Sequence, residues 1–292
     1  MNLLSNLWGL SRQKALQKGF LLKNVSYGDF FAANLLEELQ HKTYVNIGAG
    51  NFTLPGWTIL DYDTPGYNYP SNLNFLQYDI SSREALPFDD EAVDGAYCSH
   101  VLEHFSDDTI DFLLSEIERI LVPGGICRVV VPDADLAFEA LKRRDELFFI
   151  WDYWNSRADK YKAFAATAPG KWPIEFKWLH RFATERVPQD LTPSDCKIEI
   201  SELQKAIRTQ SFEDLHDLLI SPLRYRYQYS SNHINWLNYG KIQRSASKCD
   251  KLSIQRSGYL QSQDPHMRVE GFFDQTWPQM SLFLEISKHH EK

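Results

Sequence analysis

Short apolar runs alternate with polar and amphipathic stretches over the first half of the chain. Runs of this kind, without an internal polar alternation, are typical of parallel strands that are buried on both faces. The predicted strands are Tyr44–Ile47, Thr58–Leu60, Phe75–Tyr78, Gly95–Cys98 and Ile126–Val131. Between the last two, DDTIDFLLSEIERILVPGG has apolar residues at helical spacing, which predicts an amphipathic helix that ends at Pro123 and Gly124. The pattern therefore predicts an α/β fold.

This alternation stops after Asp133 and returns near residue 231. Residues 134–230 have a helical pattern, are charged and rich in aromatic residues, and show no series of strands. INWLNYGKIQRSAS then predicts a helix, KLSIQRSGYLQ a strand and MSLFLEISK a final strand. We therefore predict one α/β domain, residues 42–133 and 231–292, with a helical insertion at residues 134–230.

The connection between the first two predicted strands is unusually short. Only residues 48–56 separate them, whereas a crossover with a helix needs at least about ten to twelve residues. The first 41 residues predict one or two helices, because Asp29 can cap an apolar stripe. We expect the helix around residues 30–39 to cover the sheet face that the missing crossover helix leaves open.

Composition limits the classes of function. Lys and Arg number 31 against 39 Asp and Glu, a formal net charge of -8, which gives no overall attraction to nucleic acid. The four cysteines form no C-x-x-C pair, so neither a zinc knuckle nor a disulfide framework is predicted. No signal-peptide pattern and no apolar run long enough for a membrane span occurs. We expect a cytoplasmic protein, and the sequence leaves its oligomeric state open.

Chemistry-bearing residues follow the predicted strands. Gly48 and Gly50 form a Gly-x-Gly turn after the first strand, where backbone can approach a ligand without a Cβ in the way. Asp61 closes the second strand and Asp79 the third. Since ligands of open α/β sheets bind at the carboxyl ends of strands, these residues predict a binding site at one edge of the sheet.

Four motifs in order, VNIGAG, WTILDYD, YDISSREALPFDDEAVDGAYCSHVLEHF and ERILVPGGICRVVVPD, resemble the signatures of class I S-adenosylmethionine-dependent methyltransferases of the type 11 subgroup. The resemblance covers about residues 43–133 and continues more loosely over 233–288. It implies a Rossmann-like seven-stranded sheet, mostly parallel with the last strand antiparallel, and S-adenosylmethionine as cofactor.

Site residues follow from the resemblance by position. It implies that Gly48, Ala49 and Gly50 approach the methionine part of the cofactor. Asp61 would hold the ribose, with Asp63 as a rival two residues later. The remaining implied contacts are Asp79 and Ile80 with the adenine, and Ser99 and His100 on either side of the sulfonium.

The short connection between the first two predicted strands also distinguishes between a dinucleotide cofactor and a cofactor without phosphate. A dinucleotide fingerprint G-x-G-x-x-G requires glycine where this chain has Thr53, and a helix N-terminus for the pyrophosphate. S-adenosylmethionine carries no phosphate and can dispense with that helix. The sequence therefore favours a methyl donor over a nicotinamide cofactor.

The acceptor side is predicted from single residues. Methyl transfer to a hydroxyl needs a base, and His233 is the first candidate because it would begin the helix that faces the cofactor. His100, Asp133 and His180 are the other candidates. No metal is expected as the first reading. A less favoured reading takes His100, Glu103 and His104 as a divalent metal set, by resemblance to E-x-x-E-H segments of some methyltransferases.

Three functions stay open at this stage. The first is methyl transfer to a small-molecule or glycan acceptor, at oxygen rather than nitrogen. The second is a catalytically silent methyltransferase fold that serves as a binding module, and the weakest is a nicotinamide-dependent oxidoreductase. The insertion is either a lid that stacks on the acceptor or a small core of its own around its tryptophans, which are Trp151, Trp154, Trp172 and Trp178.

Overall fold

The computed structural model of the 292-residue chain describes most of the α/β part and much of the insertion. The described residues are 41–50, 52, 54, 56–62, 74–149, 172–187, 196–226 and 232–290. The predicted N-terminal helices, Asp63, Trp151 and Trp154 lie outside these residues.

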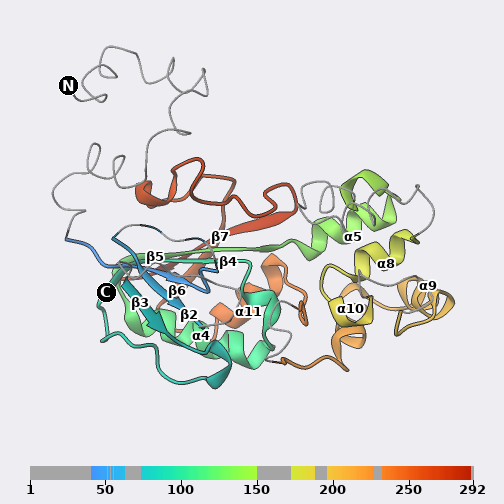
Figure 1. Cartoon of the computed structure of the whole chain (residues 1–292), viewed down its shortest axis with the longest axis horizontal. Helices are drawn as coiled ribbons and strands as arrows, with labels where there is room; N and C mark the ends of the chain where they lie inside the picture. The colour runs from blue at the N-terminus through green and yellow to red at the C-terminus, as the bar shows by residue number, and fades with distance from the viewer. Residues whose placement is uncertain are drawn as a thin grey trace, which may run out of the picture.

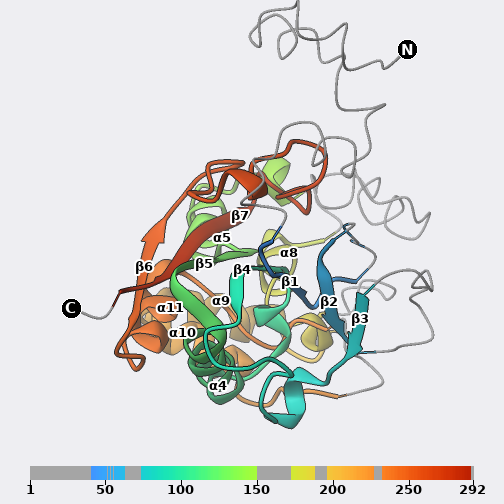
Figure 2. The ribbon, with the colours of Figure 1, turned by 90° about the vertical axis from the view of Figure 1, so that its left-hand side faces the viewer.

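A seven-stranded sheet forms the centre of the molecule, with the strand order β3-β2-β1-β4-β5-β7-β6 (Figures 1 and 2). Strands β1 to β5 pair in parallel, and β7 runs antiparallel to both of its neighbours. The predicted mostly parallel sheet with an antiparallel last strand is therefore confirmed. The strands are β1 (Tyr44–Ile47), β2 (Thr58–Asp61), β3 (Asn74–Gln77), β4 (Val93–Ser99), β5 (Leu121–Pro132), β6 (Leu252–Arg256) and β7 (Ser281–Lys288).

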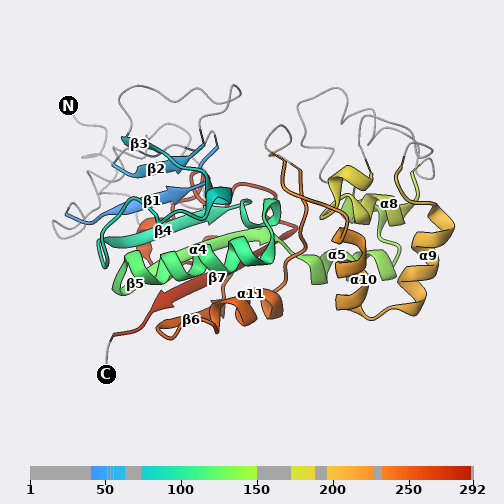
Figure 3. The same cartoon turned by 90° about the horizontal axis from the view of Figure 1, so that it is seen from below.

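Helices α4 (Asp107–Ile120) and α11 (Tyr239–Ala246) cover one face of the sheet (Figure 3). The apolar stripe of α4 packs on alternate strand residues such as Val45, Ala96 and Val129, which form one buried cluster with it. The period-3.6 pattern of a helix and the period-2 pattern of a strand thus bury their apolar sides in the same layer. None of the helices in the described ranges is long and apolar enough to cross a membrane.

The boundary between α4 and β5 differs from the prediction. The helix ends at Ile120 because Leu121 takes an extended conformation, and the strand begins at once, so Pro123 and Gly124 lie within β5 and do not end the helix. The register between β4 and β5 shifts at this point. Gly124 has φ +84°, which accommodates the irregularity, and the shift removes the need for an amide donor at Pro123.

A second correction concerns the helix before β6. The predicted helix over INWLNYGKIQRSAS is limited to α11, because the Asn238 side chain caps it by accepting a bond from the amide of Lys241 (2.8 Å). Residues 232–238, the extended segment, belong to no helix or strand and lead into this cap. His233 therefore does not begin the helix, contrary to the prediction.

The opposite sheet face is covered by the connection between β6 and β7. Met267 and Phe273 of this connection are fully buried against Tyr97 of β4 and Trp57, which precedes β2. Figure 1 shows the connection, in red, along the side of the sheet away from α4 and α11. It buries the face that the short β1–β2 connection leaves without a crossover helix. Residues 30–39, which we predict to cover that face, lie outside the described residues.

In the part of the insertion that the structure describes, helices gather beside the carboxyl end of β5 (Figures 1 and 3). They are α5 (Ala134–Lys142), α8 (Ile174–Leu179), α9 (Ile200–Thr209) and α10 (Phe212–Ile220). Trp172 and Trp178 are buried in their shared apolar cluster together with Trp236 of the extended segment. These two insertion tryptophans therefore form core, and Trp236 ties the segment 232–238 to that core.

His216 lies in the middle of this helical cluster, fully buried. Its Nδ1 donates to the carbonyl oxygen of Phe212 (2.7 Å), and burial lowers its pKa to about 4. Five aromatic rings lie with their centroids 4.2–5.8 Å from the imidazole, those of Phe138, Trp178, Phe182, Phe212 and Trp236. The imidazole is therefore held neutral in an aromatic cage.

We expect the free energy of unfolding to fall as the pH falls from about 6.5 to about 4. In this window the unfolded chain binds a proton at His216 that the folded chain does not bind, and below about pH 4 both states are protonated. The lowered pKa corresponds to at most about 3 kcal/mol. Burial also lowers the pKa of His180 and of His266 to about 4, which adds to the loss.

Urea unfolding at pH 7 and pH 4.5 measures this loss for the wild type and for His216→Phe, which removes one titrating group and keeps the ring. The variant should lose less stability than the wild type between the two pH values. The exposed His289→Gln variant is the matched control and should behave as the wild type does. An equal loss in all three proteins would contradict the assignment to His216.

A buried ion cluster joins β5 and β7 to the connection that covers the second face. Arg128, which is fully buried, donates from Nε and Nη2 to the two carboxylate oxygens of Asp274 (2.9 and 2.5 Å) and from Nη1 to Glu285. Its Nη2 also donates to the carbonyl oxygen of Gly258 (2.8 Å). The charges are thus both paired and hydrogen-bonded, as burial requires.

Asp274→Ala should lower the free energy of unfolding by about 3–5 kcal/mol, because it leaves a buried guanidinium without one of its two carboxylates. The control is Glu139→Ala, which breaks the half-exposed ion pair of Glu139 with Lys142 and should lower it by less than about 1 kcal/mol. Urea unfolding at neutral pH measures both. A loss from Asp274→Ala no larger than that from the control would contradict this prediction.

Candidate functional site

The predicted cofactor residues lie at one edge of the sheet. Strands β3, β2, β1 and β4 are neighbours and run parallel, so their carboxyl ends meet at the same edge. The segments that leave these ends carry Asp79, Asp61, the Gly48 turn and Ser99 with His100. Residues spread over more than fifty positions are thereby brought into one row.

The glycine turn after β1 depends on backbone conformations that residues with a side chain rarely adopt. Gly48 has φ +66° and its amide donates to the carbonyl oxygen of Leu60 (2.8 Å); Gly50 has φ +54°. A Cβ on Gly48 would lie 2.5 Å from Cγ2 of Val101 in the segment after β4. The absence of a side chain therefore lets the turn after β1 and the segment after β4 approach each other.

Asp61 connects the end of β2 to the glycine turn. Its Oδ2 accepts a bond from the amide of Gly50 (2.7 Å), and its Oδ1 accepts one from the amide of Tyr62 (2.6 Å). Each bond uses one lone pair of a carboxylate oxygen that can accept more than one bond. The carboxylate thus orders the turn.

Asp79 caps a short 3₁₀ helix, Ile80–Ser82, after β3. Its Oδ1 accepts bonds from the amide and the hydroxyl of Ser81 (2.8 and 2.6 Å). Within the described residues Oδ2 has no hydrogen bond, and Ile80 is buried beside it. A carboxylate oxygen and a backbone amide next to an apolar side chain suit the edge of a heterocyclic base.

Tyr225 is a residue of this site that the sequence reasoning missed. It follows α10 and packs against both the sheet cluster and the insertion cluster, with its ring 5.2 Å from that of Phe105. Burial, followed by the negative charges of Asp79, Tyr62 and Asp61, raises the pKa of its hydroxyl. Its neighbours in RYRYQYSS carry no motif that would have singled it out.

The segment after β4 begins with a strained residue. His100 has φ +55°, an uncommon conformation for a residue with a side chain, and its amide donates to the carbonyl oxygen of Val130 (2.8 Å). Its Nε2 lies 2.9 Å from Oγ of Ser281, the first residue of β7. His100 is therefore held between β5, β7 and the residues that follow it.

Three residues after His100, a group of titratable side chains gathers. Oε1 of Glu103 lies 3.2 Å from Nδ1 of His100 and 3.9 Å from Nε2 of His233. The rings of His104 and His233 meet edge to face, with centroids 4.9 Å apart. His233, although it begins no helix, is thus brought by the extended segment 232–238 to the loop after β4.

The electrostatics of this group follow from burial and mutual contact. Burial would raise the pKa of Glu103, but contact with His100, and then His104 and His233, brings it down to about 2. Burial, together with the neighbouring His104, lowers the pKa of His233 to about 3. At neutral pH the group therefore contains an ionised carboxylate and a neutral His233.

The other two residues expected on the acceptor side have structural contacts. Asp133 caps α5, where its Oδ1 accepts bonds from the amides of Asp135 and Leu136 (3.0 and 3.2 Å). His180 ends α8 in the insertion, and its Nδ1 donates to the carbonyl oxygen of Val187 (2.7 Å). Both side chains thus have structural partners, and the charge of His180 contributes to the lowered pKa of His233.

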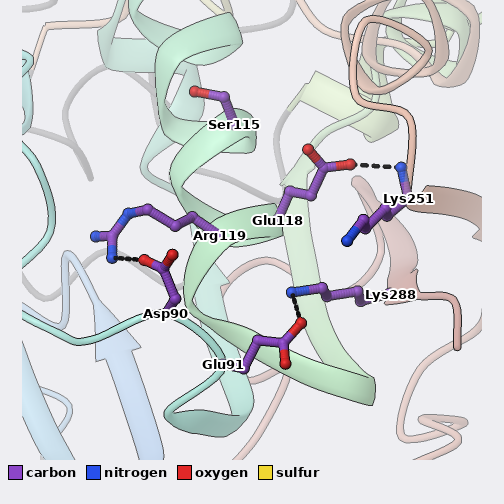
Figure 4. A pocket seen from close by; sticks show the side chains of 7 residues that line it. All are labelled: Asp90, Glu91, Ser115, Glu118, Arg119, Lys251 and Lys288. Carbon is purple, nitrogen blue, oxygen red and sulfur yellow. Dashed lines mark hydrogen bonds and ion pairs between the residues drawn. The ribbon is translucent and has the colours of Figure 1, made fainter. Parts of the chain in front are cut away.

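A cavity of about 470 Å³ opens at the opposite edge of the sheet (Figure 4). Four of its lining charges are paired, Arg119 with Asp90 (2.9 Å) and Lys288 with Glu91 (3.0 Å). It lies near the beginning of β4, away from the carboxyl ends of β1 to β4, so we assign it no part in the candidate site.

Residues 61–129 match the family described as methyltransferase domain. The match runs from the acid at the end of β2 through β5, and so includes the third and fourth strand ends described above. The resemblance to class I methyltransferases is confirmed. The sheet order, with β7 antiparallel between β5 and β6, is the methyltransferase fold that this resemblance implies.

Solved methyltransferase structures are similar to this methyltransferase fold at low sequence identity. The similarity to a methyltransferase from Methanosarcina mazei has 11% identity and a TM-score of 0.38, and covers 88% of this chain and 99% of that one. The similarity to PKMT2 from Rickettsia typhi has 13% identity and a TM-score of 0.39, and covers 87% of this chain and 50% of that one. The similarity to human N-acetylserotonin methyltransferase, solved with S-adenosylmethionine, has 11% identity and a TM-score of 0.37, and covers 90% of this chain and 53% of that one. A comparison with curated proteins finds no match.

Gly48→Ala should lower the free energy of unfolding by roughly 2–4 kcal/mol, because it adds left-handed strain to an overlap with Val101. Gly56→Ala is the matched control, since Gly56 has φ +83° and open space around a Cβ, so it should show the strain of about 1–2 kcal/mol alone.

The Val101→Ala background separates the two causes. There, Gly48→Ala should cost about as much as Gly56→Ala does, because the overlap is relieved and the strain remains. Urea unfolding of the single and double variants measures these differences. An equal cost of Gly48→Ala in both backgrounds would contradict the close approach of the two segments.

Proposed function

We propose that this protein transfers the methyl group of S-adenosylmethionine to an oxygen of a small-molecule or glycan acceptor. The observation that carries the proposal is the juxtaposition at one edge of the sheet. Two acids and a glycine turn at the ends of β1 to β3 stand beside a group of carboxylate and imidazole side chains after β4. The first set suits the cofactor, and the second suits an acceptor next to it.

The residues at the first three strand ends fit S-adenosylmethionine. Asp61 would accept the ribose hydroxyls, and Asp79 with the Ile80 amide would contact the adenine. Gly48 and Gly50 would let the methionine part approach the backbone. The described residues between β1 and β2 form no helix, so no helix N-terminus is offered to a phosphate, and this cofactor carries none.

Tyr225 adds a contact from the insertion. The ring packs between the sheet cluster and the insertion cluster, and the charges of Asp79 and Asp61 act on its hydroxyl, so the ring would lie against the ribose and adenine of a bound cofactor. Because Tyr225 comes from the insertion, we propose that the insertion closes this side of the site and shapes the space for the acceptor.

The group after β4 would act on the acceptor. S-adenosylmethionine, when bound, supplies an electrophilic methyl group on a sulfonium. As the acceptor oxygen forms its bond to that methyl group, the sulfur–methyl bond breaks and the hydroxyl proton passes to a base. We place the hydroxyl at the side chains of Glu103, His104 and His233, which offer proton acceptors grouped after the end of β4.

Isothermal titration calorimetry with S-adenosylmethionine tests the cofactor site. We expect wild-type binding with a dissociation constant of about a micromolar, and at least about tenfold weaker binding by Asp61→Asn and Asp79→Asn, because each loses the charge that holds a hydroxyl or amine. Asp89→Asn, an exposed acid outside the site, should bind as the wild type does. No wild-type binding, or unchanged binding by both site variants, would contradict the proposal.

Turnover is tested with radiolabelled S-adenosylmethionine and a panel of hydroxyl-bearing small molecules and oligosaccharides. Label transfer to an oxygen supports the proposed function. Cofactor binding without transfer to any member of the panel would instead favour the catalytically silent binding module.

A further inference from the structure

We propose that Glu103, His104 and His233 bind a divalent transition-metal ion. The first two residues lie in the short 3₁₀ helix Leu102–His104 after β4, and His233 lies in the extended segment before α11. One ligand atom from each of the three lies within 4.8 Å of the others. The predicted metal set contained His100 in place of His233, and the structure brings His233 to the group from 129 positions later in the chain than His104.

The distances suit a shared ion. Zinc binds imidazole nitrogen and carboxylate oxygen at about 2.0–2.2 Å in tetrahedral geometry, so two ligand atoms of one ion lie about 3.4 Å apart. Oε1 of Glu103 and Nε2 of His233 are 3.9 Å apart. Small side-chain adjustments would bring all three ligand atoms within bonding distance of one ion.

Both imidazoles are held in the orientation that a metal ligand needs. Nδ1 of His104 lies 3.0 Å from the carbonyl oxygen of Asn232, and Nδ1 of His233 lies 2.6 Å from that of Arg181. A carbonyl oxygen only accepts, so each Nδ1 carries a proton and donates it. In the neutral ring the lone pair is then on Nε2, the arrangement in which a backbone carbonyl positions a metal-binding histidine.

Glu103 supplies an independent observation. Its carboxylate is 1% exposed, and within the described residues neither oxygen has a hydrogen bond of good geometry, although Nδ1 of His100 lies at 3.2 Å. A buried carboxylate without hydrogen bonds is costly, and a cation between it and two imidazoles would satisfy it.

The donor set favours one class of ion. Two imidazole nitrogens and one carboxylate oxygen suit Zn²⁺, Co²⁺ or Fe²⁺, whereas Mg²⁺ and Ca²⁺ prefer oxygen ligands alone. Three protein ligands leave at least one coordination position open. Resting on the proposed function, the inference assigns that position to the acceptor oxygen, which the ion would hold beside the end of β4. With the ion bound, Glu103, His104 and His233 would act as ligands in place of the base, and the hydroxyl proton would pass to water.

Metal binding is measured on the untagged full-length protein after treatment with a chelator. We expect one equivalent of Co²⁺ to give visible absorption bands typical of nitrogen and oxygen ligands, and Zn²⁺ alone to bind in calorimetry with a dissociation constant of about a micromolar or lower. Glu103→Gln and His233→Asn should each weaken Zn²⁺ binding by at least about tenfold and reduce the Co²⁺ bands.

The control is His289→Gln, which removes an exposed histidine and should leave metal binding unchanged. Urea unfolding checks that each variant is folded, and if Glu103→Gln is not, His104→Asn at the half-buried ligand replaces it. Absence of stoichiometric binding by the wild type, or equal binding by the wild type and the folded ligand variants, would overturn the inference.

Cofactor binding distinguishes this inference from the proposed function. S-adenosylmethionine should still bind the metal-free protein, since Asp61, Asp79 and the glycine turn contain none of the metal ligands. Loss of metal binding with intact cofactor binding would refute the metal site alone. Metal binding by a protein that does not bind S-adenosylmethionine would refute the proposed function and leave the metal site standing.

Discussion

The backbone carbonyl of Glu103 joins the two parts of the candidate site. It accepts bonds from the amides of Ile234 and Asn235 (3.0 and 3.1 Å), and the Asn235 side chain donates to the carbonyl oxygen of Phe105 (2.9 Å). These bonds hold the extended segment 232–238 against the loop after β4. On its other side the segment is bonded to the insertion, where the amide of His233 donates to Oγ1 of Thr184 (2.8 Å). These hydrogen bonds on both sides of the segment hold His233 near Glu103.

A short connection between β1 and β2 sets a second constraint. Because no crossover helix fits there, Trp57 and Tyr97 would leave a large aromatic surface uncovered. The β6–β7 connection covers it with apolar side chains and with Asp274, which pairs with the buried Arg128. The same short connection leaves the glycine turn without a helix, which suits a cofactor that has no phosphate. The short β1–β2 connection therefore affects both the core and the edge of the sheet that carries the candidate site.

Asp274 and Glu103 are both buried carboxylates, but their surroundings stabilise the negative charge to different extents. Asp274 has a paired guanidinium with near-ideal geometry, so its charge is stabilised within the core. Glu103 is as deeply buried, but the described residues give it only imidazoles at poor hydrogen-bond geometry. The first arrangement stabilises the folded core, whereas the second is typical of a ligand-binding site.

The sequence by itself determined the strands, the helix α4, and the placement of Gly48, Asp61 and Asp79 at strand ends, because periodicity and turn chemistry act between near neighbours. The order of the motifs also identified the methyltransferase fold. Tertiary structure alone decided that His233 meets Glu103, that Tyr225 packs between the sheet and the insertion, and that residues 257–280 cover the second face. These depend on contacts between residues more than a hundred positions apart, and no local pattern encodes which distant segments meet.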